Sequence, residues 1–374
     1  MIYFDNSATT LIKPKEVCEA VVYAMNHFGN AGRSFYDCTM EASRAVYGAR
    51  DVIAKFACVE DALSVAFTSS ATESLNLVIN GLIDRDDHVI TTVAEHNSVL
   101  RPIFNSKCEV SFIECDEKGV LLLDNLDALL RANTKCVVAT HASNLTGNIS
   151  DIALLKDFCE SNNLIFVLDA SQTFGGIETK ASYADIICFT GHKALLGPQG
   201  TGGIICNIPQ SVKITKTGGT GSNSFDQIQP HVMPDMFESG TANSHGLNGL
   251  RAGVEYVISR GVNKIHEEEM ILTNAFIKGI SNVEGIEFYG DIFAENRMPI
   301  VSVNIETMSS DEVAMKLWQE HSIATRPGSH CAPLLHKHFG TEERGIVRFS
   351  FSHFNTIEEI EKGISAIKKI ASER

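Results

Sequence analysis

The feature that most constrains the fold is a regular alternation, from about residue 60 to 206, of short apolar runs with stretches of helical periodicity. In residues 73–82 and 152–160, for example, apolar side chains recur at helical spacing. Strands that alternate with helices indicate βαβ units, so the sequence predicts a mostly parallel sheet with helices on its faces. The expected strands are Leu63–Phe67, His88–Val93, Lys135–Thr140, Leu164–Leu168, Asp185–Phe189 and Gly203–Cys206.

A second pattern begins near residue 250. Helical periodicity covers residues 250–259, 263–283, 311–321 and 356–371, and strand-like runs lie at 300–305 and 346–351. A chain of 374 residues is long for one compact core. We therefore expect a large α/β domain followed by a smaller α/β module.

The charge and the hydropathy of the chain exclude several classes of protein. The formal net charge of −15 argues against binding to nucleic acid or to an anionic membrane, both of which require basic patches. No apolar run approaches the ~20 residues that span a bilayer. The N-terminus lacks the pattern of a secretory signal, and the ten cysteines form no C-x-x-C pair. We expect a cytoplasmic protein with reduced thiols.

Lys193 and Asp169 each follow an apolar run, and 24 residues separate them. Both are therefore expected at the carboxyl ends of neighbouring strands, where open α/β sheets place their ligand crevice. Pyridoxal 5′-phosphate needs these two groups. The lysine forms a Schiff base with its aldehyde, and the carboxylate keeps the pyridine nitrogen protonated. The pair predicts a pyridoxal-phosphate enzyme.

A site for the cofactor phosphate is expected at residues 68–74, Thr-Ser-Ser-Ala-Thr-Glu-Ser. This segment joins a strand to a helix, and the free N–H groups of a helix start attract anions, here at Ala71 and Thr72. Taken alone, the hydroxyl residues indicate simple helix capping. Beside the lysine and the aspartate, they favour a phosphate site.

Further polar residues cluster at the same predicted sheet edge. His96 follows the strand that ends at Val93 and is placed to stack on the cofactor ring, with a structural hydrogen bond as the plainer alternative. Gln172 is a candidate for the phenolic oxygen of the cofactor. Thr190 and His192 flank the lysine and are candidates for its phosphate.

Two residues are candidates for binding a substrate carboxylate. Asn144 follows a strand, and Arg348 stands in an otherwise apolar one. A guanidinium group is the natural bidentate partner of a carboxylate. A structural salt bridge at Arg348 is an equally good interpretation of the local sequence.

Cys331 discriminates between functions, because it lies in a loop with Gly328 and two prolines rather than in an apolar segment. A cysteine there, beside His330, can act as a nucleophile. Together with His336 and His338 it also suggests a metal site, but three ligands without a second cluster support this weakly. We expect no metal.

These segments together resemble the class V aminotransferase family, and within it the branch of cysteine desulfurases and selenocysteine lyases. The resemblance runs from residues 3–10, Tyr-Phe-Asp-Asn-Ser-Ala-Thr-Thr, to Arg348 and residues 355–356. The pattern Arg-x-Gly-x-His-Cys-Ala at 326–332 is similar to that of group II desulfurases, whose catalytic cysteine lies on a short loop. Only 17 positions separate Cys331 from Arg348.

The resemblance implies the fold type I architecture of pyridoxal-phosphate enzymes, with a mostly parallel seven-stranded sheet. It divides the chain into an N-terminal segment at 1–15 that joins the small domain, a large cofactor-binding domain at 16–249, and a small C-terminal domain at 250–374. The small domain would carry the loop with the catalytic cysteine.

The resemblance also implies a role for each candidate residue. Lys193, Cys331 and His96 would be catalytic, and Asn144, Arg326 and Arg348 would bind the substrate. Thr241, in the segment Glu-Ser-Gly-Thr, would reach the phosphate of the neighbouring subunit, so a homodimer with shared active sites is implied. The remaining cofactor contacts would come from Ala71, Thr72, Asp169, Gln172, Thr190 and His192.

The implied reaction converts L-cysteine to L-alanine, with a persulfide on Cys331 that passes to an acceptor protein or a small thiol. Selenocysteine lyase, a class V aminotransferase in which Cys331 is incidental, and a non-catalytic scaffold are the alternatives. Two positions depart from the group II pattern. Ser329 replaces a histidine, and Pro327 stiffens the loop by fixing its own φ.

Overall fold

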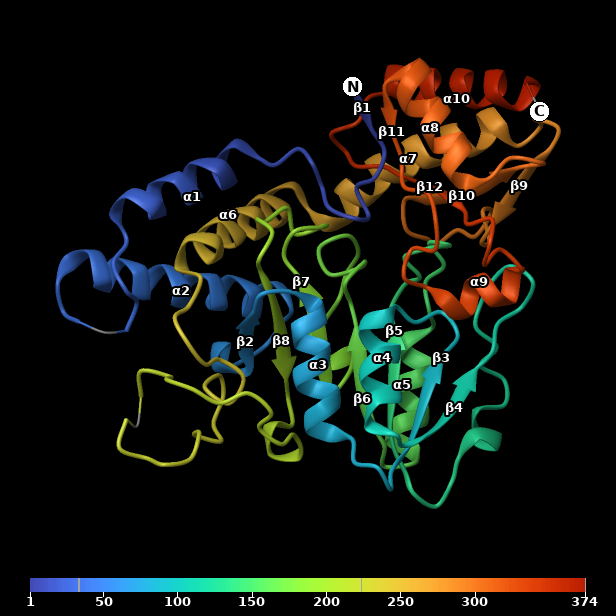
Figure 1. Ribbon diagram of the computed structural model, residues 1–374. Coiled ribbons are helices and arrows are strands. Elements are labelled where there is room, and N and C mark those ends of the chain that lie inside the picture. Colours follow the sequence, from blue (N-terminus) through green and yellow to red (C-terminus); the bar gives the residue numbers. More distant parts are fainter. Residues whose placement is uncertain (33, 223, 374) are drawn as a thin grey trace.

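The computed structural model describes residues 1–32, 34–222 and 224–373 (Figure 1). Its centre is a seven-stranded sheet in the order β2-β8-β7-β6-β5-β3-β4. All pairings are parallel except those of β8, which runs antiparallel to both β2 and β7. The predicted mostly parallel sheet is confirmed. The strands are β2 (Val65–Thr68), β3 (His88–Thr92), β4 (Glu109–Ile113), β5 (Thr134–Thr140), β6 (Ile165–Asp169), β7 (Ile186–Thr190) and β8 (Gly202–Cys206).

Helices cover both faces of this sheet, because its inner strands are apolar on both sides. Successive strand residues point to opposite faces, so that Val167 and Leu168, for example, pack in two separate cores. The helices α3 (Ala71–Leu82) and α4 (Asn97–Ser106) pack on one face. The other face is covered by α2 (Asp37–Phe56), α5 (Ile152–Ser161) and α6 (Ser244–Arg260).

The C-terminal part forms a second, smaller α/β unit around an antiparallel three-stranded sheet in the order β12-β10-β9. Its strands are β9 (Ile286–Tyr289), β10 (Ile300–Ile305) and β12 (Val347–Ser350). The N-terminal β1 (Ile2–Tyr3) pairs in parallel with β11 (Ile323–Ala324) of this unit. The helices are α7 (Val262–Ile280), α8 (Ser310–His321), α9 (Pro333–Phe339) and α10 (Ile357–Ser372).

The boundaries of several elements differ from those predicted. Helix α6 begins at Ser244 rather than near residue 250, because the side chain of Asn243 caps it by accepting the Gly246 N–H. A division of the chain at residue 249 would therefore cut α6, which packs against α1 (Lys15–His27) and α2.

Among the described residues, no helix is both long and apolar enough to cross a bilayer.

Candidate active site

Nearly all of the predicted site residues line one cavity of about 210 Å³. The arrowheads of β3 and β4 in Figure 1 point toward the C-terminal unit, and the cavity lies at this carboxyl edge of the parallel strands. This is the edge at which open α/β sheets bind ligands. The predicted residues that line it are Ala71, Thr72, His96, Asn144, Asp169, Gln172, Thr190, His192, Lys193, Arg326 and Arg348.

Lys193 lies in the loop between β7 and β8, which the N-terminal segment holds in place. Thr10 donates from its hydroxyl to the carbonyl oxygens of His192, at 3.1 Å, and Lys193, at 3.2 Å. Burial lowers the pKa of Lys193 to about 8; Arg348 and Arg326 act in the same direction, and the charge of Asp169 opposes them. A lower pKa leaves a larger fraction of the amine unprotonated near pH 7, and only the unprotonated amine attacks an aldehyde.

Asp169 is the last residue of β6, and its side chain is buried. Its Oδ1 accepts hydrogen bonds from the backbone N–H of Ser171, at 2.9 Å, and from the Ser171 hydroxyl. These bonds fix the orientation of the carboxylate, and both of them end on Oδ1 rather than Oδ2. Gln172 lies on the same turn and donates to the carbonyl oxygen of Ser7 at 3.4 Å.

The start of α3 lines the cavity through Ser70, Ala71 and Thr72. Ser70 is the cap, and its hydroxyl accepts the Glu73 N–H at 3.2 Å. The N–H groups of Ala71 and Thr72 have no partner within the helix, as in the first turn of any α-helix. They and the positive end of the helix dipole suit an anion.

His96 caps α4, and its Nδ1 accepts the backbone N–H of Ser98 at 3.0 Å. This bond assigns the proton of the neutral ring to Nε2. Burial lowers the pKa of His96 to about 4, so the imidazole is neutral at pH 7. The Ser98 hydroxyl joins His96 Nδ1 and the Thr72 hydroxyl, both at 2.8 Å, and so connects α4 with the start of α3.

Arg348, on β12, is 1% exposed and makes the structural salt bridge that its sequence context allowed. Its Nη2 lies 2.8 Å from Asp5 Oδ1 in an ion pair, and its Nη1 donates to the carbonyl oxygen of Asn144 at 2.8 Å. It also lines the cavity. Its buried Nε has no hydrogen-bond partner among the described residues.

Cys331 is half-buried, and its loop is anchored on two sides of the cavity. The Asn97 N–H donates to the carbonyl oxygen of Cys331 at 2.8 Å, and Asn144 Nδ2 donates to that of His330 at 2.7 Å. Both loop residues have positive φ, 56° at Cys331 and 49° at His330, a region that is uncommon for residues other than glycine. Of the two, only His330 lines the cavity.

The imidazole of His330 is neutral. Its Nε2 lies 2.9 Å from the carbonyl oxygen of Ile346, to which it donates, and burial lowers its pKa to about 2. The ring therefore supplies no positive charge to the neighbouring thiol.

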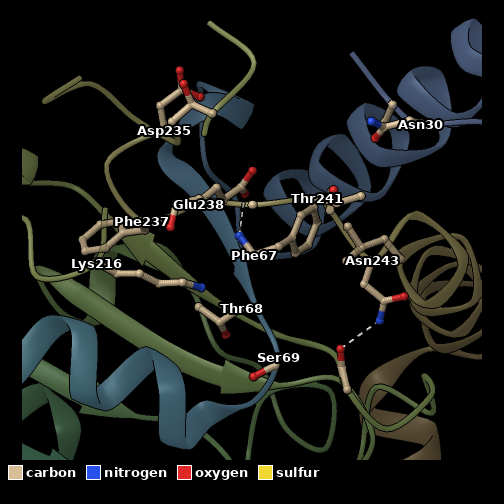
Figure 2. Close-up of a pocket in the computed structure, with 17 residues that line it drawn as sticks. Asn30, Phe67, Thr68, Ser69, Lys216, Asp235, Phe237, Glu238, Thr241 and Asn243 are labelled. Atoms are coloured by element: carbon tan, nitrogen blue, oxygen red, sulfur yellow. Dashed lines mark hydrogen bonds between the residues drawn. The ribbon is translucent and has the colours of Figure 1, made fainter. Parts of the chain in front are cut away.

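Thr241 does not line the cavity that holds Lys193. It lines a separate pocket of about 190 Å³. Figure 2 shows it there together with Lys216, Glu238 and Asn243. Thr68 and Ser69 line this second pocket, while the next residues of the chain line the first. The β2–α3 turn therefore separates the two pockets.

His336 and His338, the two histidines that follow Cys331, each contact an oxygen atom of the protein itself. His336 Nδ1 contacts the Thr341 hydroxyl at 2.8 Å, and His338 Nε2 contacts the carbonyl oxygen of Asp116 at 2.9 Å. The residues that the structure describes contain no cluster of three His, Cys, Asp or Glu side chains suited to a metal ion.

Sequence reasoning missed the contribution of the N-terminal segment. Ser7 and Ala8 line the cavity, and Asp5 pairs with Arg348. Nothing in the local pattern of these residues indicates a site. Only their place in the amino-terminal motif, Asp-Asn-Ser-Ala-Thr-Thr, marked the segment, and the motif said nothing of these contacts.

Comparisons with known proteins agree with the fold. The model of the family "Aminotransferase class-V" matches residues 2–362. A probable cysteine desulfurase of Pyrococcus abyssi is 32% identical over 99% of this chain and 94% of its own. A cysteine desulfurase IscS of Vibrio atlanticus is 30% identical over 98% and 92%.

A solved structure of a cysteine desulfurase from Thermococcus onnurineus superposes with a TM-score of 0.93 at 31% identity. It covers 100% of this chain and 95% of the other, and the predicted fold type I architecture is confirmed. From the match to the family model over nearly its whole length and from these relatives, the chain belongs to the class V aminotransferase family.

Proposed function

We propose that the protein is a pyridoxal-phosphate-dependent cysteine desulfurase that converts L-cysteine to L-alanine and carries the sulfur as a persulfide on Cys331. One observation carries the proposal. A lysine, an aspartate, a helix start and a buried arginine line the same cavity, and the loop of Cys331 is anchored to its walls. The names of its relatives agree with this chemistry.

The residues of the cavity fit the cofactor group by group. Lys193, with its lowered pKa, would hold the aldehyde, and Asp169 would face the pyridine nitrogen. The start of α3, with Thr190 and His192, would hold the phosphate, while His96 would stack on the ring and Gln172 would reach the phenolic oxygen. When bound, pyridoxal phosphate supplies an electron sink that stabilises negative charge at the substrate α-carbon.

The substrate carboxylate would bind at Arg348, with Asn144 and Arg326 beside it. Asp5 and the carbonyl oxygen of Asn144 occupy one N–H group on each terminal nitrogen of the guanidinium. Each of these nitrogens carries a second N–H, and Nε–H is also unpaired among the described residues. Arg348 can therefore keep its structural ion pair and still bind a carboxylate.

The chain's own side chains supply the proton transfer and the nucleophile. Lys193, once released as a free amine, removes the α-proton, and neutral His96 is the candidate relay. The Cys331 thiolate attacks the substrate sulfur, so that an S–S bond forms and the C–S bond breaks. The β-carbon keeps the electron pair and takes up a proton to give L-alanine. The persulfide then passes to an acceptor protein or to a small thiol.

The protein loaded with pyridoxal phosphate is expected to release equal amounts of L-alanine and sulfide from L-cysteine when a thiol reductant is present. The measurement is amino-acid analysis of the products, with the cofactor-free protein as the control. L-selenocysteine, supplied in parallel, identifies a lyase if it alone is converted. Formation of a keto acid from an amino donor, without sulfide, would identify an aminotransferase and overturn the proposal.

We infer further that two subunits share their active sites, with Thr241 reaching the cofactor phosphate of the partner. Thr241 is exposed and lies outside the cavity of its own chain. The preceding segment is fixed in place. Arg50 binds both oxygens of Glu238, at 2.8 and 3.0 Å. The Phe67 N–H donates to the same carboxylate at 2.6 Å (Figure 2). Thr241 is therefore presented outward on a rigid support.

A mixed dimer tests this sharing. Thr241→Ala removes a charge-assisted hydrogen bond, so we expect the Kd for pyridoxal phosphate to rise about tenfold. When Lys193→Ala and Thr241→Ala subunits are combined, one site of each mixed dimer contains both native residues. At a cofactor concentration between the two Kd values, where a Thr241→Ala site is mostly empty, each mixed dimer is then expected to show about half of the wild-type activity. If Thr241 served its own subunit, no site would contain both native residues, and the mixed dimer would be no more active than the Thr241→Ala subunit by itself.

A further inference from the structure

Glu95 is a buried carboxyl group that the proposed reaction does not use. It is 0% exposed and directly precedes His96. Its Oε1 accepts two hydrogen bonds, from the Thr92 hydroxyl and from the Thr140 N–H, both at 2.7 Å. The side chain therefore joins the end of β3 to the end of β5.

This contact continues the sheet beyond its last backbone pair. The register of β3 with β5 ends at Thr91 and Val138, although β5 extends to Thr140. Glu95 Oε1 takes the N–H of Thr140 in place of a carbonyl oxygen from β3. The chain leaves β3 toward His96 and leaves β5 toward Asn144, so one side chain holds together the strand ends that lead to both residues.

The second carboxyl oxygen of Glu95 favours the protonated form. Oε2 is buried and has no hydrogen-bond partner among the described residues, which is costly for an ionised group. Burial raises the pKa of Glu95 to about 8, with the charge of Asp169, on β6, acting in the same direction. His96, on the adjoining turn, is neutral at pH 7 and offers no counter-charge.

We propose that Glu95 is a positioning residue that acts as a neutral acid, holding His96 and the end of β5 around the cofactor while adding no second negative charge beside Asp169. The inference deepens the proposed function and rests on it. Two neighbouring buried carboxylates are not both ionised cheaply. A neutral Glu95 therefore provides the hydrogen bonds of a carboxyl group at the edge where Asp169 is to face the ring.

Two variants separate the hydrogen bond from the charge. Glu95→Gln keeps a carbonyl oxygen for Thr92 and Thr140 but cannot ionise, whereas Glu95→Met keeps the length of the side chain and leaves both donors unpaired. We expect Glu95→Gln to bind pyridoxal phosphate within about threefold of the wild type, with an unchanged pH titration of its absorption band. Glu95→Met is expected to bind at least about tenfold more weakly.

The pH dependence of unfolding of the cofactor-free protein reports whether Glu95 is protonated in the folded state. The pKa of Glu95 is raised in the folded state, so the wild type loses stability as pH rises from 4.5, its ordinary value, to about 8. Glu95→Gln has no such loss. The difference in stability between the two should grow across this range and then level off, whereas the control Glu117→Gln, at an exposed site, shows no such growth.

Two results would overturn the proposal. A shifted absorption titration in Glu95→Gln, with no growth of the stability difference, means that Glu95 is ionised. Wild-type cofactor affinity in Glu95→Met means that it positions nothing. Neither measurement requires turnover, so a protein that binds pyridoxal phosphate but makes no alanine would contradict the desulfurase function and leave this inference testable.

Discussion

Lys193→Ala should lower kcat for L-alanine formation by at least about a thousandfold, because the residue has two tasks. As a nucleophile it binds the cofactor, and as a free amine it moves the α-proton, a step for which one general base contributes roughly 10²–10⁴-fold. Burial brings its pKa to about 8, so a substantial fraction of the amine is neutral near that pH. The absorption band of the protein-bound cofactor should also be lost.

Lys193→Arg separates charge from chemistry. It keeps a cation beside Asp169 but has no amine that can react with an aldehyde, so we expect a loss as large as that of Lys193→Ala. Lys156→Ala is the matched control, since Lys156 forms a surface pair with Glu160 and should keep wild-type activity. Turnover by Lys193→Arg within tenfold of the wild type would contradict the assignment.

The interior of the large sheet was predictable because its strands are buried on both faces and read as continuous apolar runs. The edge strand β4 was not predicted. Its residues are mostly half-exposed, and polar and apolar residues alternate over only four positions before Ile113, so Glu109–Ile113 gives a weak strand signal. The helices α1 and α2 were also missed, although α2 packs its alanine-rich face on the sheet core.

The site was predictable where residues follow strands. Asp169 ends β6, while Lys193 and His96 lie three and four residues beyond the ends of β7 and β3, and parallel strands deliver such residues to one edge. Ser7 lines the same cavity from the other end of the chain, and Asp5 pairs with Arg348, because β1 pairs with β11. Only the tertiary fold creates this proximity, and no local periodicity encodes it.

Glu95 and Thr241 illustrate two further limits. A glutamate after a strand reads as a solvated turn residue, and its burial becomes apparent only when β3 and β5 are side by side. Thr241 carries no local signal, and its pocket lies outside the cavity of its own chain. Its proposed role depends on a second subunit, which no pattern within one chain describes.

Cys331→Ala should lower desulfuration of L-cysteine by at least about a hundredfold while leaving cofactor binding unchanged, because it removes the sulfur acceptor and no residue that lines the cavity. Mass spectrometry of the wild type after a single turnover should find one extra sulfur atom on the peptide that contains Cys331. Cys38→Ala, at another partly exposed cysteine, is the control and should retain full activity.

The same variant distinguishes the two candidate substrates. Selenium leaves carbon more readily than sulfur, so L-selenocysteine depends less on attack by a thiolate. If Cys331→Ala loses activity with L-cysteine but keeps it with L-selenocysteine, the cysteine serves sulfur transfer specifically. Full L-cysteine turnover by Cys331→Ala would exclude it as the acceptor.

The neutral His330 sharpens this test, because a ring held by the carbonyl oxygen of Ile346 gives the thiol no cationic partner. A loss of L-cysteine turnover in Cys331→Ala is then not explained by an ion pair between the thiol and His330.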